Sequence, residues 1–290
     1  MNNIKTFENF NNQDIFTYIR NNDIESVKKY IDSGYDLNIQ NNDGNTPLIL
    51  TTYNYNSEIV KLLLNAGADV DKQDNDGYTA LILASYYNRI EIVKLLLNAG
   101  ADLNKQNNNG DTSLIWAAIN NNIKIVKLLL NAGAYIDKQN NSGNNALIWA
   151  ASNNNREILE LLLDYGANAD KQDNIGYTAL IYASRNNNRE IVKLLLNAGA
   201  DIDKQDNDGY TSLIYAASNN NREMIEFLLD YGADEFILNY DNVSFYDYLN
   251  TENQQYFTQN YPTSVYNAIY HKYKKSFTDF VKDYNIKNNK

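Results

Sequence analysis

The stretch "NREIVKLLLNAGADIDKQDNDGYTSLIYAAS", residues 188–218, decides the fold, because much of it occurs twice in one chain. Residues 90–119 read "IEIVKLLLNAGADLNKQNNNGDTSLIWAAI". Two series of glycines each have a spacing of 33 residues. The first series is Gly44, Gly77, Gly110, Gly143, Gly176 and Gly209. The second series is Gly34, Gly67, Gly100, Gly133, Gly166, Gly199 and Gly232. A fixed period of this length indicates stacked structural repeats.

Each repeat predicts two short helices followed by a projecting loop. In the second helix, Ile191, Leu194 and Leu195 fall at i, i+3 and i+4, which places them on one apolar face. Thr211 precedes the apolar segment of the first helix, where its hydroxyl can accept from a free backbone N–H group. Gly199 can adopt the left-handed backbone that ends a helix. The polar segment "DKQDNDG" turns at Asp-Gly, which favours a hairpin-like loop.

These features resemble the ankyrin-repeat family. The resemblance rests on D/N-x-x-G-x-T-x-L-x-x-A at the first helix and on "LLLNAGAD" at the end of the second, and it covers residues 11–250. It implies an all-α solenoid of helix–turn–helix units with projecting hairpin loops. Neighbouring units would bury the apolar faces that a single unit leaves open.

Two positions depart from the family pattern. The family's usual histidine after the T-P-L core is replaced by Ile49, Ile82, Ile115, Ile148, Ile181 and Ile214. Its usual glycine between the two helices is replaced by Asn88, Asn121, Asn154, Asn187 and Asn220. Asparagine tolerates left-handed backbone well, so the turn should be kept. Tyr55 holds this position in the first full repeat, where we expect local distortion or a different turn.

The repeat pattern predicts four segments. Residues 1–43 hold an N-terminal segment and a capping repeat, and residues 44–240 hold six ankyrin repeats. Residues 241–261 form a degenerate C-terminal capping repeat, with "SFYDYL" as a last capping helix. Residues 262–290 predict an amphipathic helix preceded by Pro262, because apolar side chains follow near i+4 spacing at Val265, Ile269, Tyr273, Phe277 and Phe280.

The composition excludes several classes of protein. The net charge of -11 disfavours binding to nucleic acid or to an anionic membrane surface, since both need a basic face. The absence of cysteine excludes disulfides and thiolate metal sites and fits a reducing compartment. The N-terminus lacks the apolar region of a secretory signal, and no apolar run approaches the length of a membrane span. We therefore expect an intracellular, cytoplasmic monomer.

Motifs for catalysis, cofactors and metals are missing from the sequence. The single histidine, His271, has no fixed partner and is interpreted as a surface or tail residue rather than a base. "DNDG" at 74–77 and 206–209 superficially resembles an acidic calcium loop, but the twelve-residue ligand spacing ending in Glu is missing. The sequence therefore predicts a protein that is not an enzyme, with neither cofactor nor metal.

The positions that vary between repeats are the candidate binding residues. The resemblance implies that partners bind on the concave face, which is made of first-helix ends and loop tips. Here those positions hold Tyr53, Tyr78, Tyr86, Tyr87, Ile119, Ile175, Tyr177, Arg185 and Tyr210. Tyrosine and arginine are frequent anchors of protein interfaces. The alternative is that these tyrosines only reflect a chain with 24 of them.

Trp116 and Trp149 lie one period apart, in a column that also holds Leu50, Leu83, Tyr182 and Tyr215. The column is either an aromatic recognition stripe or packing between neighbouring first helices. We favour packing, because leucine also serves there.

The predicted function is a protein–protein interaction scaffold. Acidic loop tips at Asp43, Asp76, Asp111 and Asp208 suggest a partner with basic character, or they serve only solubility. A second hypothesis is an adaptor that recruits other machinery, such as a ubiquitin ligase, through the helix after Pro262. Capping of the last repeat by that helix is the favoured alternative. Asn104, in "GADLN", resembles a site that asparaginyl hydroxylases modify in other ankyrin proteins.

Overall fold

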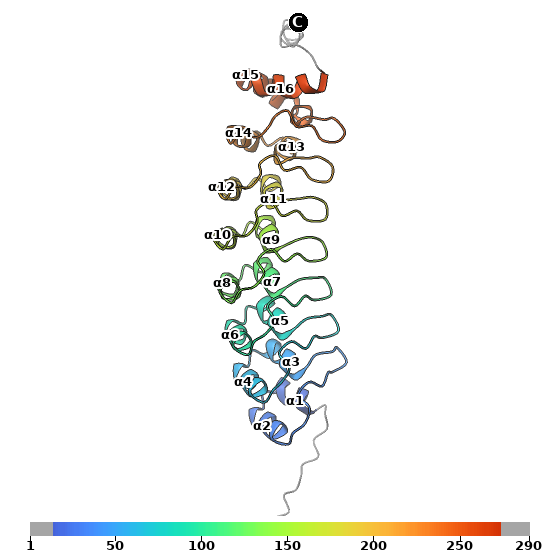
Figure 1. Ribbon diagram of the computed structural model, residues 1–290, viewed down its shortest axis with the longest axis vertical. Helices are drawn as coiled ribbons and strands as arrows, with labels where there is room; N and C mark the ends of the chain where they lie inside the picture. Colours follow the sequence, from blue (N-terminus) through green and yellow to red (C-terminus); the bar gives the residue numbers. More distant parts are fainter. Residues whose placement is uncertain (1–13, 274–290) are drawn as a thin grey trace, which may run out of the picture. The chain divides into compact units, whose positions relative to one another are not determined.

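The computed structural model describes residues 14–273, which form helices and loops and no strand (Figure 1). The predicted all-α fold is therefore confirmed. The chain divides into two compact units, Met1–Asn141 and Ser142–Lys290, which we call unit 1 and unit 2. The predicted tail positions Phe277 and Phe280 lie outside the described residues. No helix within 14–273 is long and apolar enough to cross a membrane.

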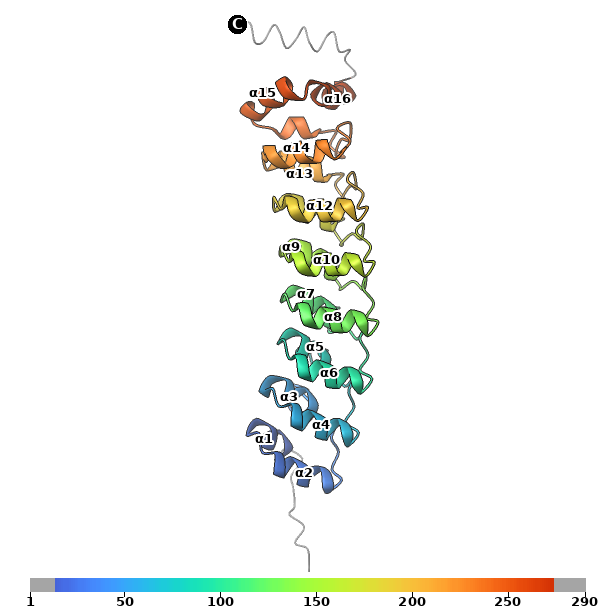
Figure 2. The same cartoon turned by 90° about the vertical axis from the view of Figure 1, so that its left-hand side faces the viewer.

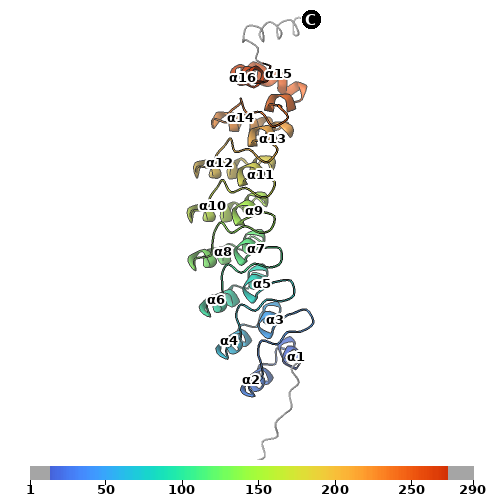
Figure 3. The same cartoon turned by 45° about the vertical axis from the view of Figure 1, so that its right-hand side comes forward.

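Unit 1 is a stack of helix pairs. They are α1 (Asp14–Arg20) with α2 (Ile24–Asp32), α3 (Pro47–Asn54) with α4 (Ser57–Asn65), α5 (Ala80–Tyr86) with α6 (Ile90–Asn98), and α7 (Ser113–Ile119) with α8 (Ile123–Asn131). The first helices of successive pairs pack on one another in one row, and the second helices pack in another (Figures 1 and 2). The loops project from the first-helix side, as Figure 3 shows for α3, α5 and α7.

Unit 2 is built from helix pairs of the same kind. Its pairs are α9 (Ala146–Ser152) with α10 (Arg156–Asp164), α11 (Ala179–Arg185) with α12 (Arg189–Asn197), and α13 (Ser212–Ser218) with α14 (Arg222–Asp230). A 3₁₀ helix, η1 (Phe245–Tyr248), packs on α13 and is followed by α15 (Thr251–Asn260) and α16 (Pro262–Tyr273). The capping helix expected at "SFYDYL" is thus a single 3₁₀ turn, and α15 was not predicted.

The predicted caps form at the first helices. The hydroxyl of Thr46 accepts from the N–H of Ile49 at 3.1 Å, and Asn145 Oδ1 accepts from the N–H of Ile148 at 2.9 Å. Each repeat has a buried apolar core, which includes the isoleucines that replace the family's histidine. In α12 the fully buried face holds Ile191, Val192 and Leu195, while Leu194 is half-buried.

The turns between paired helices use left-handed backbone at asparagine, as predicted. Asn88 has a φ of 58°, and Asn121 has a φ of 56°. Tyr55 adopts the same conformation, with φ 56° and ψ 38°, so the expectation of a different turn there is wrong. The helix before it, α3, runs one residue further than α5 or α7. The guanidinium of Arg89 lies 5.0 Å from the Tyr55 ring and contributes a stacking contact at this strained residue.

Polar ladders tie successive loops together within each unit. The side chain of Gln73 donates to its own loop at Gly77 O and, at 2.9 Å, to Gln106 O in the next loop. Asn108 donates through its backbone to Asp76 O and through its side chain to Asn75 O. These bonds satisfy backbone groups that would otherwise have to form hydrogen bonds with water. They also hold the loops in register with the helices.

The glycine of each loop is required by this close stacking. Gly77 has a φ of +80°, and a Cβ atom there would lie 2.7 Å from the backbone nitrogen of Asn108. Gly67, at the end of α4, also has a positive φ, but a Cβ atom there would meet nothing within 4 Å. The two glycine series therefore meet different requirements. The loop glycines let the backbone of the next loop come close, and the helix-end glycines adopt the left-handed conformation.

Candidate protein-binding surface

An aromatic patch lies on the first-helix face of unit 1. We define the unit 1 patch as Tyr53, Tyr78, Tyr86, Tyr87 and Trp116. The ring of Tyr87 lies 5.5 Å from that of Tyr53 and 4.7 Å from that of Tyr86, both edge to face. Tyr86 lies 4.9 Å from Trp116, and Tyr78 lies 6.3 Å from it. Tyr53, Tyr86 and Tyr87 each remain 38–39% exposed.

The geometry of the patch combines a rigid base with an open surface. Trp116 is half-buried, and its Nε1 atom is buried without a hydrogen-bond partner. The half-buried indole therefore packs against the fold and contacts the rings of Tyr86 and Tyr78. Edge-to-face rings of this kind bury area at a small cost in side-chain entropy, which is typical of interface anchors.

Carboxylates lie near two tyrosines of the patch, Tyr53 and Tyr78. Burial is the main cause that raises the pKa of Tyr53 to about 12, and the phenol of Tyr87 and the carboxylates of Asp74 and Asp43 act in the same direction. Burial also raises the pKa of Tyr78, and Asp111, Asp74 and Asp76 add to that effect. The electrostatic field on these tyrosines is therefore negative, and a cation is the charge that it favours.

Unit 2 carries a tyrosine network on its own first-helix face. We define the unit 2 network as Tyr177, Tyr182, Tyr215, Arg185 and the carboxylates of Asp173 and Asp206. Tyr182 donates to Asp173 Oδ2 at 2.8 Å, and Tyr215 lies 2.5 Å from Asp206 Oδ2 and 2.7 Å from the Tyr177 hydroxyl. Burial and the hydrogen bonds to these carboxylates raise the pKa of both Tyr182 and Tyr215.

Arg185 completes the network from the end of α11. Its guanidinium lies 5.0 Å from the Tyr177 ring and 5.2 Å from the Tyr215 ring. A planar cation over two tyrosine faces is a favourable cation–π arrangement. The network is therefore a preorganised surface, in which hydrogen bonds fix the phenols and an arginine covers their faces.

Tyr210 extends the aromatic surface toward η1. Its ring stacks on Tyr215 at 5.1 Å, and its hydroxyl lies 2.6 Å from that of Tyr248 in η1. Burial and the hydrogen bond with Tyr210 raise the pKa of Tyr248 to about 12. Asn239 donates to the same hydroxyl at 3.2 Å. Tyr210 thus connects the network to η1.

The structure brings most of the predicted residues together within their own units. Tyr53, Tyr78, Tyr86 and Tyr87 meet in unit 1, and Tyr177, Arg185 and Tyr210 meet in unit 2. Ile119 ends α7 and is half-buried, whereas Ile175 is a loop-tip residue with 54% of its surface exposed.

The candidate set predicted from the sequence left out the half-buried and buried residues that support it: Trp116, Tyr182, Tyr215, Tyr248, Asp173 and Asp206. The column containing Trp116, Tyr182 and Tyr215 held the signal, because its members follow each loop by a constant interval. Because the column was predicted to serve packing alone, its residues were not grouped with the exposed tyrosines. In the structure the two sets of rings touch, so packing and surface display are combined.

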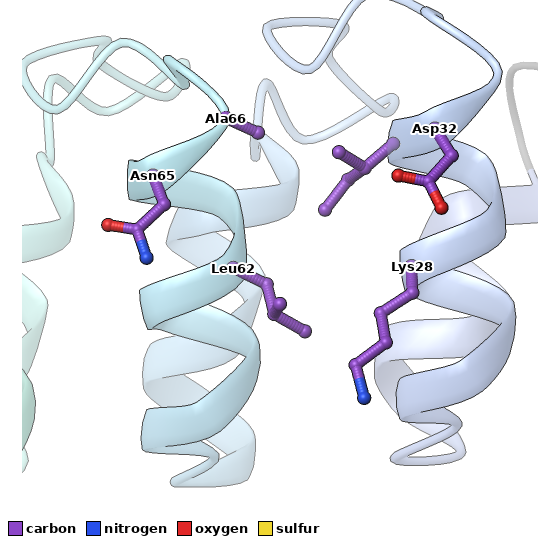
Figure 4. Close-up of a pocket in the computed structure, with 6 residues that line it drawn as sticks. Lys28, Asp32, Leu62, Asn65 and Ala66 are labelled. Atoms are coloured by element: carbon purple, nitrogen blue, oxygen red, sulfur yellow. The ribbon is translucent and has the colours of Figure 1, made fainter.

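The opposite side of unit 1 holds a shallow cavity between α2 and α4. It has a volume of about 430 Å³ and is lined by Lys28, Ile31, Asp32, Leu62, Asn65 and Ala66 (Figure 4). The Lys28 ammonium lies 3.1 Å from Glu25, so its charge is already paired. Leu62 and Lys28 face each other across the gap, and this open groove between two helices lacks the enclosure of a small-molecule site.

The described residues offer little for other chemistry. Among residues 14–273, no group of three or more His, Cys, Asp or Glu side chains is placed to hold a metal ion. The side chain of His271 lies outside the part of the structure that is described. Asn104 accepts from the N–H of Tyr135 through Oδ1 at 2.9 Å, which is a bond between neighbouring repeats.

Comparisons with known proteins agree with this architecture. The family model for ankyrin repeats (3 copies) matches residues 15–107, 99–173 and 166–239, which is more than half of the chain. The chain therefore belongs to the ankyrin-repeat family. No curated protein matches its sequence.

Two solved structures are similar to this chain. The ankyrin repeat domain of Bcl-3, a member of the IkappaB protein family, is 29% identical with a TM-score of 0.68, and the match covers 73% of this chain and 96% of that one. The ankyrin repeat protein EF0377 is 34% identical with a TM-score of 0.62, over 64% of this chain and 98% of that one. Ankyrin repeats generally mediate protein–protein interactions and are generally non-enzymatic.

Proposed function

We propose that this chain is a non-enzymatic scaffold that binds a partner protein on the first-helix and loop-tip face. The observation that carries the proposal is the unit 1 patch, where three partly exposed tyrosines pack edge to face with one another and one of them, Tyr86, packs on a half-buried tryptophan. Isolated exposed tyrosines are ordinary, but a contiguous set on the face that ankyrin repeats generally use is a reason to expect a partner.

The proposed organisation keeps residues 44–240 as six repeats between residues 1–43 and 241–261, which cap the ends. We also propose that the protein acts as an intracellular, cytoplasmic monomer.

The helix after Pro262 is proposed to cap the array rather than to recruit machinery. Its Val265 and Ala268 side chains are fully buried, because α16 packs on η1 and α15. Asn267 also donates to Glu235 at 2.8 Å. These contacts use the apolar face that an adaptor helix would need for a second partner. Deletion of 261–290 should therefore lower the melting temperature of unit 2.

The experiment that tests the scaffold is affinity capture from lysate with matched variants. One variant carries Tyr53→Ala, Tyr86→Ala and Tyr87→Ala, and a second carries Tyr177→Ala and Arg185→Ala. The control carries Tyr135→Ala and Tyr165→Ala, two exposed tyrosines that follow second helices. All variants are first compared with wild type by circular dichroism and thermal melting.

A partner that wild type and the control capture, and that either face variant loses, supports the proposal. A partner that all variants capture equally contradicts the proposed face. Loss by the control alone would move the binding site to the second-helix side.

A further inference from the structure

We propose that the unit 1 patch binds an arginine side chain from a basic segment of the partner protein, held between tyrosine rings and loop-tip carboxylates. This inference rests on the proposed function and names the chemistry of the partner. Unit 2 offers an internal comparison, because a cation lies over aromatic rings at the equivalent repeat positions there.

Three positions of the repeat correspond between the units. Tyr177, Arg185 and Tyr215 in unit 2 occupy the places that Tyr78, Tyr86 and Trp116 occupy in unit 1, three periods earlier. In unit 2 the arginine of the chain covers two aromatic rings at 5.0 and 5.2 Å. In unit 1 the same place is held by Tyr86, which adds an aromatic ring and leaves the cation to come from elsewhere.

Loop carboxylates lie near two tyrosines of the patch. Asp43 and Asp76 are exposed loop-tip residues, and Asp74 lies at the start of the same turn as Asp76. The ionised carboxylates of Asp74 and Asp43 both act on Tyr53 and raise its pKa. The nearby Arg89 has its guanidinium over Tyr55 and Tyr87, with Nε 3.4 Å from Thr52 O. It is therefore held beside the turn between α3 and α4.

Arginine fits this environment better than a neutral or acidic side chain. Its planar guanidinium stacks on aromatic faces and donates to carboxylates in the same plane. The net charge of -11 would also attract a basic segment over a longer range. A nucleic acid, which is also a large flexible ligand, would be repelled by the same carboxylates.

The test uses a labelled glycine–serine peptide carrying several arginines, and the same peptide with citrulline in place of each arginine. Citrulline keeps the shape and removes the charge. We expect the citrulline peptide to bind wild type about tenfold more weakly, and arginine-peptide binding to weaken as salt rises. Fluorescence of Trp116 in a Trp149→Phe background reports binding at the patch.

Two matched variants separate the slot from overall charge. Tyr86→Arg places an arginine where Arg185 lies in unit 2, so it should fill the slot and reduce peptide binding about tenfold. Ser152→Arg adds the same charge at the equivalent position of another repeat and should change binding about twofold or less. Asp43→Asn and Asp76→Asn should each weaken binding about two- to fivefold. Asparagine is tolerated at this repeat position, because Asn109 occupies it one period after Asp76.

Equal binding of the two peptides overturns the proposal, as does equal weakening by Tyr86→Arg and Ser152→Arg. Neither result decides the proposed scaffold function, which has its own capture test. If the variant with Tyr53→Ala, Tyr86→Ala and Tyr87→Ala fails to capture a partner that wild type captures, that partner binds this face whatever its chemistry. Conversely, arginine-specific binding to the patch would stand even if no partner were captured from the chosen lysate.

Discussion

The two units place different side chains at the same three repeat positions. Unit 1 has Tyr78, Tyr86 and Trp116, and the rings of both tyrosines pack against the indole. In unit 2, Tyr215 donates to Asp206, and Arg185 covers the rings of Tyr215 and Tyr177. The repeat backbone is therefore a constant frame on which a few substitutions produce either an open aromatic surface or a closed polar one.

The largest effect should come from the frame that the units share. Gly77→Ala in unit 1 and Gly176→Ala in unit 2 should each lower the free energy of unfolding by about 2–4 kcal/mol, because a Cβ atom would lie 2.5–2.7 Å from the next loop's backbone nitrogen and φ is positive. Denaturant unfolding followed by circular dichroism measures this loss.

The glycines at helix ends are the matched control. Gly67→Ala and Gly166→Ala have a positive φ but open space around the new Cβ, so they should cost only about 1–2 kcal/mol. If the loop and helix-end variants lose equal stability, close stacking of the loops is not what requires glycine.

The next effect should separate the units. Tyr215→Phe removes a donor from Asp206 and should cost about 1–2 kcal/mol, since bonds to carboxylates are stronger than neutral ones. Tyr86→Phe removes an exposed hydroxyl and should change stability by less than about 0.5 kcal/mol. Trp116 lies in unit 1 and Trp149 in unit 2. Replacing Trp149 therefore leaves a fluorescence signal for the unfolding of unit 1, and replacing Trp116 leaves one for unit 2. Equal losses would mean that the network adds nothing to unit 2.

Arg185 should contribute less than the tyrosine hydroxyls. Arg185→Ala removes an exposed guanidinium from two rings and should cost about 0.5–1 kcal/mol. Arg189→Ala, at an exposed position that begins α12, is the control and should be neutral. Thermal melting at low and high salt compares them. An Arg185→Ala variant that melts like the control would show that the guanidinium covers the rings without stabilising them.

The smallest effect concerns alkaline pH in unit 1. The folded pKa of Tyr53 is raised to about 12, above the ordinary value of about 10, so the neutral phenol stabilises the fold. That contribution is complete below pH about 10 and is lost as the pH rises toward 12. Tyr53→Phe should therefore show a shallower alkaline fall in melting temperature than wild type. Identical alkaline profiles would contradict a burial-raised pKa.

Much of the frame was predictable because the period fixes it. The threonine caps, the asparagine turns and the helix-ending glycines each follow from local chemistry that is repeated along the chain. Tyr55 was misjudged because local preference disfavours left-handed tyrosine, whereas the packed helices on either side determine the turn. The helix α15 was missed because "TENQQYFTQN" lacks the apolar periodicity of the other second helices.

The candidate surface was only partly predictable. Exposed positions such as Tyr53 and Tyr86 could be picked out because they vary between repeats. Their supporting residues could not, because a contact such as Tyr215 with Tyr177 joins side chains 38 residues apart in the sequence. The hydroxyl–carboxylate bonds of unit 2 depend on the distance between a loop and a helix, which no local motif encodes.

The most direct test of the scaffold is the affinity of a captured partner for single-site variants of the two faces. The account predicts that Tyr86→Ala weakens the measured Kd by about tenfold or more, as expected of an interface anchor, while Tyr135→Ala leaves it within about twofold. An unchanged Kd for Tyr86→Ala together with a large loss for Tyr135→Ala would contradict it and would place the partner away from the first-helix face.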